Sequence, residues 1–345
     1  MALRRKTDPQ STPLDGIDLL LADLDGVVYR GGEALPHAVD SLQRVKQDRR
    51  VGYVTNNASR TPAAVADQLA GFGLSVTPDD IVTSPQAAVV LLADLVPAGA
   101  TVLVVGGEGL TSEVERAGFM VTRSALDAPA AVIQGFHPSV GWTELAEASF
   151  ALATPVGGGE GIPWVATNTD WTLPLERGIA PGNGTLVSAV HTAVGRLPVF
   201  AGKPERAIFD AALARFGSGV ALAVGDRLDT DILGANRADI PSALVLTGID
   251  GPRQLLPAAP DHRPTFIVED LRGLFEPYPA IVETSRRDGT REFRSGAATV
   301  AVAGSKVVLE TLGAPRIDVI RAGCAAVWGA GLSIYALDVD PRLHA

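Results

Sequence analysis

Two aspartates separated by one residue follow the first apolar run of the chain. Leu19–Ala22 is followed by Asp23, and Asp25 and Gly26 come next. Such a run is typical of a strand buried on both faces of a parallel sheet, so we expect both carboxylates at its carboxyl end, beside a ligand crevice. Two close negative charges repel each other, and a divalent metal that prefers oxygen ligands would offset the repulsion. A carboxylate beside a metal can also attack phosphorus. From this stretch alone, an exposed acidic turn is an equal alternative.

The next expected strand, Arg50–Asn57, also ends in small polar residues. Thr55, Asn56 and Asn57 offer a hydroxyl and two amides at the same edge of the sheet. These neutral groups can donate hydrogen bonds to phosphoryl oxygens, so we predict that they bind phosphate. The alternative is local: Asn57 or Ser59 caps the helix that follows.

Two later apolar runs end in charged residues. We expect a strand from Pro198 that ends at Lys203, and a second strand from Val220 that ends at Asp226. In a parallel sheet these ends meet the first two at one edge. Asp23, Asp25 and Asp226 could then hold Mg²⁺, with Lys203 as the cation that faces the acids and a phosphate. Asp231, five residues further on, is expected to support this group from behind rather than to bind the metal.

The spacing of apolar residues predicts helices between these strands, at 36–47, 61–70, 186–194 and after Pro204. Alternation of strands and helices is the pattern of an α/β protein with a Rossmann-like, doubly wound parallel sheet.

The middle of the chain predicts a second α/β unit at residues 87–186. Strands are expected at 101–105, 130–134 and 164–167, with helices at 87–95, 111–117 and 142–153. Gly106–Gly109 does not fit a dinucleotide-binding loop, because Ser112 occupies the place of the third glycine. Gly157–Gly161 is expected to form a turn. The loops at 168–174 and 179–185 are rich in turn residues, and such loops often carry specificity or serve as plain connections.

Composition narrows the class of protein. The 345 residues carry a net charge of −10 and no sustained basic run, which argues against nucleic acid or an anionic membrane surface as the main partner. We find no apolar core of a signal peptide and no stretch long enough for membrane insertion. The single Cys324 excludes an intrachain disulfide and fits a reducing compartment, so we expect a cytoplasmic protein.

The four motifs, in this order and spacing, resemble those of the haloacid dehalogenase-like phosphatase superfamily. Inside the middle unit, Thr-Asn-x-Asp at 167–170 and Pro-Gly-x-Gly at 181–184 are similar to the branch of nitrophenylphosphatases and N-acetylglucosamine metabolism. The resemblance covers about Leu14–Glu276. It implies a discontinuous catalytic core at 14–86 plus 187–276, with residues 87–186 as a cap domain inserted into it.

The resemblance also implies a mechanism. Asp23 would be the nucleophile that forms an aspartyl-phosphate, and Asp25 the general acid and base. Mg²⁺ would be held by the carboxylates of Asp23 and Asp226 and by the backbone carbonyl of Asp25. In the cap, Asn168 and Asp170 are expected near the substrate. Relatives with this cap often dimerise, so the resemblance allows a homodimer.

The substrate implied is a small phosphate ester. Overall likeness favours the glycerol 3-phosphate phosphatases of actinobacteria. Phosphoglycolate, pyridoxal phosphate and nucleoside monophosphates are the alternatives within the class. A regulatory or binding module with a vestigial phosphatase core is the alternative of another class.

Residues 277–345 extend beyond the resemblance. A strand at 298–303, a helix at 315–328 and a closing strand at 332–337 predict a small α/β appendage. Its layout is faintly similar to part of an acetyltransferase-like fold, but we find no glycine-rich segment that would bind a pyrophosphate. We therefore expect it to serve packing or oligomer formation.

Overall fold

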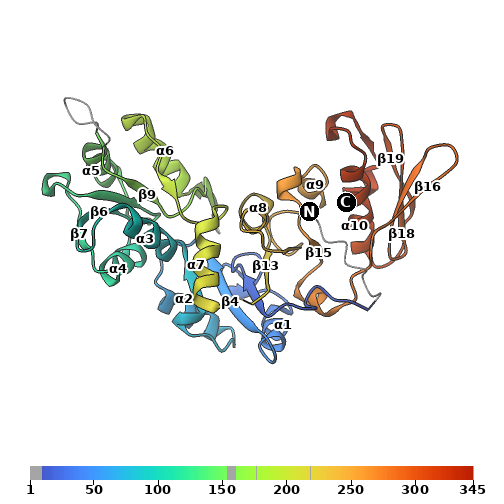
Figure 1. The fold of residues 1–345 in the computed structure, drawn as a ribbon, viewed down its shortest axis with the longest axis horizontal. Helices are drawn as coiled ribbons and strands as arrows, with labels where there is room; N and C mark the ends of the chain where they lie inside the picture. Colours follow the sequence, from blue (N-terminus) through green and yellow to red (C-terminus); the bar gives the residue numbers. More distant parts are fainter. Residues whose placement is uncertain (1–9, 154–160, 176, 218, 345) are drawn as a thin grey trace.

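The computed structural model describes residues 10–153, 161–175, 177–217 and 219–344. These residues form one six-stranded sheet, two five-stranded sheets and two two-stranded sheets. The three larger sheets follow one another along the long axis of the molecule, with the six-stranded sheet between the other two (Figure 1). Of the turn predicted at Gly157–Gly161, residues 157–160 lie outside the described part.

The central sheet is parallel throughout, with strand order β15-β14-β13-β1-β4-β5. Alternate residues of β1 belong to different hydrophobic clusters, since Leu19 and Leu21 pack on one face and Leu20 and Ala22 on the other. This explains the unbroken apolar run. The predicted Rossmann-like fold is confirmed. The strands are β1 (Leu19–Ala22), β4 (Arg50–Thr55), β5 (Ile81–Thr83), β13 (Ala221–Gly225), β14 (Ser242–Val245) and β15 (Phe266–Val268).

Helices and short turns connect these strands. The helix α2 begins after Thr61, whose hydroxyl accepts a hydrogen bond from Ala64 N–H at 3.2 Å and so caps it. A small hairpin, β2 (Tyr29–Arg30) and β3 (Glu33–Ala34), follows the first acidic motif. The helices are α1 (Ala38–Val45), α2 (Pro62–Gly71), α3 (Ser84–Leu95), α7 (Arg206–Phe216), α8 (Leu233–Arg237) and α9 (Pro252–Leu255), with shorter turns η1 (Pro78–Asp80), η3 (Leu228–Ile232), η4 (Pro260–His262) and η5 (Leu271–Phe275).

A second parallel sheet, with order β12-β9-β8-β6-β7, lies beside the central one. One hydrophobic cluster runs from Val54 and Val82 of the central sheet to Val102 and Ile133 of this sheet, so the two units share a core. The elements are β6 (Thr101–Val105), β7 (Met120–Thr122), β8 (Ala131–Gln134), β9 (Trp164–Ala166), β12 (Val199–Phe200), α4 (Glu108–Arg116), η2 (Ala125–Asp127), α5 (Trp142–Leu152) and α6 (Asn183–Val194).

The position of β12 corrects the sequence analysis. The strand that leads to Lys203 was expected in the same sheet as Asp23, but β12 pairs with β9 of the second sheet, so this prediction is wrong. Its two residues are too few to reveal from the sequence which sheet they join. After β12, the N–H groups of Ala201 and Gly202 continue the pairing with the second sheet. The N–H of Lys203 then turns to Asn56 of the central unit at 2.8 Å.

The two polar segments predicted as loops, 168–174 and 179–185, contain most of an antiparallel hairpin, so the loop prediction is wrong for these strand residues. Its strands are β10 (Thr172–Leu175) and β11 (Gly178–Pro181), and Gly182 then leads into helix α6. A proline in each strand and a glycine in β11 hide this hairpin from an analysis based on alternation.

The last unit is an antiparallel sheet with one helix on it. The predicted helix is present as α10 (Arg316–Gly329) and packs on β17 and β18. The closing strand expected at 332–337 is wrong, because the turn η6 (Ile334–Ala336) lies there. The remaining elements are β16 (Val282–Ser285), β17 (Arg291–Ser295), β18 (Ala298–Ala303), β19 (Lys306–Thr311), β20 (Asp338–Val339) and η7 (Pro341–Leu343). Arg321 of α10 donates to the carbonyl of Ile267 at 2.9 Å, which joins this unit to the central sheet. Among the described residues, no helix is both long and apolar enough to cross a bilayer.

Candidate active site

A cavity of about 1110 Å³ lies where the two parallel sheets present their carboxyl ends. Asp23, Thr55 and Asp226 line it from the ends of central strands, and Phe136 and Asn168 from the ends of strands in the second sheet. Every residue in the predicted phosphate, catalytic and cap sets lines this cavity, namely Asp23, Asp25, Thr55, Asn56, Asn57, Asn168, Asp170, Lys203 and Asp226. Asp231 lies behind it, beside Asp23 and Lys203.

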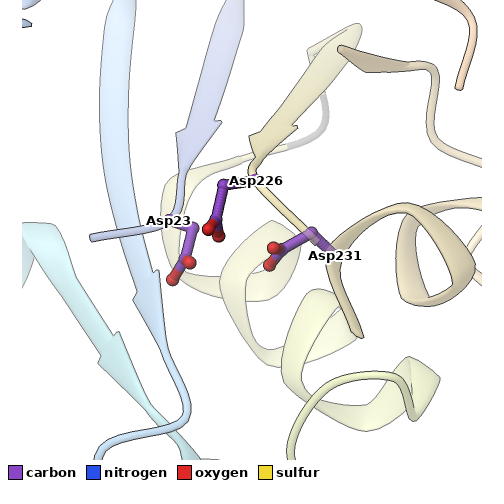
Figure 2. A group of neighbouring side chains, drawn as sticks. All are labelled: Asp23, Asp226 and Asp231. Carbon is purple, nitrogen blue, oxygen red and sulfur yellow. The ribbon is translucent and has the colours of Figure 1, made fainter. Parts of the chain in front are cut away.

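Three carboxylates meet at the bottom of the cavity. Asp23 follows β1 and Asp226 follows the neighbouring β13, while Asp231 comes from the turn η3, and Figure 2 shows their carboxyl groups gathered together. One oxygen of each lies within 4.8 Å of the others. The ammonium of Lys203 is 2.6 Å from Asp23 Oδ1 and 2.6 Å from Asp231 Oδ1. One lysine therefore faces three acids in a buried place.

The electrostatics of the cluster follow from this imbalance. Burial, together with the negative charge of Asp231, raises the pKa of Asp23 well above its usual value, and Lys203 offsets only part of the rise. The same two causes raise the pKa of Asp226 to about 7. For Lys203, burial would lower the pKa, but attraction to Asp23 and Asp231 is stronger and the pKa is raised. The site holds more negative charge than the protein compensates, which fits a bound divalent cation.

Backbone groups fix the carboxylates in place. Ile249 N–H donates to Asp226 Oδ2 at 2.8 Å. Glycines make the close approach possible, since a Cβ on Gly26 or Gly248 would lie 2.3 or 1.9 Å from the same oxygen. Gly26 also has φ of +78°, which favours glycine.

Asp231 differs from the other two acids in its partners. One of its oxygens accepts from Lys203 and the other from Arg227 N–H at 3.1 Å. Within the described chain, Asp23 and Asp226 each receive protein donors on one oxygen. Asp23 and Asp226 are thus better able to bind a metal, and Asp231 holds the lysine.

The segment after β4 makes mostly internal hydrogen bonds. Thr55 Oγ1 accepts from Asn57 N–H at 3.2 Å, and Asn57 Oδ1 accepts from Ser59 N–H at 2.9 Å. The carboxamide of Asn56 donates to Lys203 O at 3.0 Å and to Asp170 Oδ1 at 3.1 Å. The Asn56 side chain therefore ties the central unit to the second unit. Asn57 closes a turn, and the helix cap considered for Asn57 or Ser59 belongs to Thr61.

The two predicted cap residues join this network. Asn168 Nδ2 donates to Asn56 O at 2.7 Å, and Asp170 N–H donates to Asn168 Oδ1 at 3.2 Å. Burial raises the pKa of Asp170, although its hydrogen bond from Asn56 acts in the opposite direction. A carboxyl group at this place can accept a hydrogen bond from a hydroxyl, and when protonated it can also donate one.

Comparisons with known proteins agree with this geometry. A family model described as haloacid dehalogenase-like hydrolase matches residues 20–120, and one described as HAD-hydrolase-like matches residues 200–274. The D-glycerol 3-phosphate phosphatase of Mycobacterium tuberculosis is 43% identical over 313 residues, which cover 91% of this chain and 86% of the relative. This chain belongs to the haloacid dehalogenase-like hydrolases.

Other relatives of this hydrolase bear related names. A glycerol-3-phosphate phosphatase of Gallus gallus is 38% identical over 258 residues, or 68% of this chain and 81% of the relative. The crystal structure of a glycerol phosphate phosphatase from M. tuberculosis in complex with magnesium has a TM-score of 0.83 at 39% identity, covering 96% of this chain and 95% of that one. The resemblance inferred from the four motifs is confirmed.

The structure adds residues to the hydrolase site that the motifs did not suggest. Tyr29, Arg60 and Arg227 line the cavity. The phenol of Tyr29 accepts from Arg60 Nη2 at 3.1 Å and lies 3.5 Å from Asp25 Oδ2. Each of these residues follows one of the motifs within five positions, which is the only sign of them in the sequence.

Proposed function

We propose that the protein is a Mg²⁺-dependent phosphatase that hydrolyses glycerol 3-phosphate to glycerol and phosphate. The observation that carries the proposal is the buried group of Asp23, Asp226 and Lys203 at the end of a cavity. This group combines a nucleophile with an excess of negative charge that a divalent cation would offset. The names of the relatives from M. tuberculosis and G. gallus support the choice of ester.

The reaction has two steps in this proposal. An oxygen of Asp23 bonds to phosphorus while the bond from phosphorus to the glycerol oxygen breaks, and protonated Asp25 gives its proton to that oxygen. Water then attacks the aspartyl-phosphate. Asp25 takes a proton from the water, the bond between Asp23 and phosphorus breaks, and phosphate leaves.

The pKa of Asp25 is raised mainly by burial, although the carboxyl group opens on the cavity, while the charges of Arg60 and Lys203 lower it. A carboxyl group that holds its proton more readily than usual suits a residue that must first donate a proton and then accept one.

Mg²⁺, when bound, would neutralise phosphoryl charge and align the group for attack. We propose the carboxylates of Asp23 and Asp226 and the backbone carbonyl of Asp25 as its ligands. Lys203, held by Asp231, would face a phosphoryl oxygen, with Thr55, Asn56 and Asn57 near the remaining ones. Since the carboxamide of Asn56 is already bonded within the protein, we assign its contribution to position rather than to direct side-chain contact.

The domain division belongs to the proposal as well. Residues 14–86 and 187–276 would form the catalytic core and residues 87–186 the cap, with β12 pairing on the cap side. Asn168 and Asp170 would contact the hydroxyl groups of the substrate. We also propose a cytoplasmic location, to which the free and buried Cys324 is suited, and a homodimer that size-exclusion chromatography with light scattering would test.

A panel of phosphate esters tests the substrate. We expect kcat/KM to be highest for glycerol 3-phosphate among glycerol 3-phosphate, phosphoglycolate, pyridoxal phosphate and a nucleoside monophosphate. The cavity is large enough that the bulkier esters are real competitors. A clear preference for an aromatic or nucleotide ester would replace our choice of substrate.

A variant tests the chemistry separately from the substrate. Asp23→Asn should abolish phosphate release with every ester while the circular dichroism spectrum is unchanged. Turnover that persists in this variant would contradict the covalent mechanism. The absence of phosphate release from wild type with every ester would favour a binding module instead.

A further inference from the structure

The phenol of Tyr29 lies between Asp25 and Arg60. A tight turn brings it there, because Leu24 O accepts from the N–H groups of Val28 at 2.8 Å and Tyr29 at 3.2 Å. Gly26 N–H also donates to Tyr29 O at 2.9 Å. The turn folds the chain back so that Tyr29, only 1% exposed, stands beside the carboxyl group two residues after Asp23.

The direction of these hydrogen bonds follows from the chemistry of arginine. A guanidinium can only donate, so at 3.1 Å the Tyr29 oxygen must accept from Arg60 Nη2. The phenol proton is then free to point at Asp25 Oδ2, 3.5 Å away. A phenol that accepts from a cation becomes a better donor. Arg60 is itself held by Gln68 Oε1 of helix α2.

Asp25 has few other side-chain partners. In the described parts of the chain, Tyr29 is the one side chain with a hydrogen bond to its carboxyl group. No ion pair is found for Arg60 in the same residues, so its charge is available to polarise the phenol. Among the described side chains, Tyr29 alone fixes by a hydrogen bond which way the Asp25 carboxyl turns.

We propose that Tyr29 and Arg60 are positioning residues that orient Asp25 for proton transfer to the leaving oxygen. The proposal rests on the phosphatase function above. Tyr29 holds Oδ2, which leaves Oδ1 to face the leaving oxygen. The long apo contact shortens when substrate is bound, as catalytic hydrogen bonds often do.

How strongly the loss of kcat/KM depends on the leaving group distinguishes a positioning role of Tyr29 from a purely structural one. An alkoxide leaves poorly without a proton, whereas 4-nitrophenolate leaves well without one. The value of kcat/KM reports steps up to the departure of the leaving group, so a misplaced Asp25 should affect glycerol 3-phosphate much more than 4-nitrophenyl phosphate.

The experiment measures kcat/KM with Mg²⁺ for both esters in wild type and Tyr29→Phe. In Tyr29→Phe, kcat/KM for glycerol 3-phosphate should fall roughly 10- to 100-fold, which is a part of the usual contribution of acid–base catalysis. For 4-nitrophenyl phosphate the fall should be at least about fivefold smaller. Tyr53→Phe is the matched control. It removes another buried phenol oxygen, one without a hydrogen-bond partner in the described structure, and should change neither value.

A double variant completes the test. Adding Tyr29→Phe to Asp25→Asn should cause no further loss with glycerol 3-phosphate, because Tyr29 acts through Asp25. Equal losses with both esters, full activity of Tyr29→Phe, or losses that multiply in the double variant would each overturn the proposal. Failure of the phosphatase assignment looks different, because wild type would then release no phosphate from either ester, or Asp23→Asn would remain active.

Discussion

Two parallel sheets present their carboxyl ends to the same cavity, but they carry different side chains there. The central sheet contributes Asp23, Asp25 and Asp226. From the neighbouring sheet, β12 leads to Lys203, while the ends of β8 and β9 contribute Phe136 and Asn168, which are uncharged. We call the ends of β8 and β9 the neutral edge and the ends of the central strands the charged edge. The charged edge bears the groups that could break a phosphate ester. The neutral edge gives the cavity its shape and polarity. A shared fold therefore does not give the two sheets a shared task.

The two edges also differ in what they cost the folded protein. Buried acids with raised pKa values destabilise the fold whenever they are ionised, and the central edge contains two of them, Asp23 and Asp226, of which Asp23 contacts Lys203. The neutral edge is held by amide hydrogen bonds such as Asn168 to Asn56, which carry no such cost. Changes at the charged edge should thus separate activity from stability.

The largest separation of activity from stability is expected for the variant Asp226→Asn. Loss of a proposed metal ligand should reduce phosphate release by at least about 1,000-fold. In the absence of Mg²⁺ the same variant should be more stable than wild type. Because the folded pKa of Asp226 is about 7 and lies above the ordinary value, wild type loses stability as pH rises from about 4 through 7.

Chemical unfolding in EDTA measures this gain. It should be about 4 kcal/mol at pH 8 and close to zero at pH 4. A variant that is less stable than wild type at pH 8 would show that the ionised carboxylate is well compensated in the protein alone.

Lys203→Met should act in the opposite direction on stability. It removes the cation between Asp23 and Asp231 and leaves buried negative charges unpaired, which typically costs about 3–5 kcal/mol. Activity should fall too. Arg206→Met on the surface is the control, since its ion pairs with Asp210 and Asp239 are exposed and screened by solvent. If urea unfolding shows that both variants lose the same free energy of unfolding, burial does not make the contacts of Lys203 stronger than those of Arg206.

Removal of Mg²⁺ should have a somewhat smaller effect on stability. Binding of an ion at 100 times its Kd stabilises the folded state by about 2.7 kcal/mol. We expect Mg²⁺ to raise the thermal midpoint of wild type and to restore activity after EDTA, but to leave the midpoint of Asp226→Asn nearly unchanged. An equal rise in both proteins would place the ion at another site.

The charged edge could be predicted from the sequence because each acid ends an apolar run. Asp23 and Asp226 follow β1 and β13, which are buried on both faces, and such runs are visible without a structure. Lys203 was predicted to reach the acids, and it does so, but from a strand of the other sheet. The sequence of a two-residue strand holds too little information to choose its partner.

The neutral edge was harder to foresee. Asn168 and Asp170 were expected near the substrate only through a family resemblance, and their network with Asn56 depends on contacts between residues more than 110 positions apart. Tyr29 and Arg60 were missed because a single tyrosine or arginine beside a motif has no periodic pattern. Long-range hydrogen bonds of single side chains leave no local trace in the chain.

The smallest expected effect concerns Asp170, two residues beyond Asn168. It shows whether a charge beside the neutral edge destabilises the folded protein. Burial raises the pKa of Asp170, so the folded state binds a proton more tightly there than the unfolded chain does. Wild type should lose stability as pH rises from the unfolded pKa through the raised one. Asp170→Asn keeps an acceptor for Asn56 and removes the titration, so its free energy of unfolding should match that of wild type near pH 4 and exceed it at pH 8.

The control is Asp67→Asn, the same substitution at an exposed position of helix α2, which should not reproduce this gain. An Asp170→Asn variant that is less stable than wild type at pH 8 would mean that Asp170 works as a charged partner, for instance of Arg227. The neutral edge would then lie beside a charge that stabilises the fold, and the two sheets would differ only in how many charges they carry.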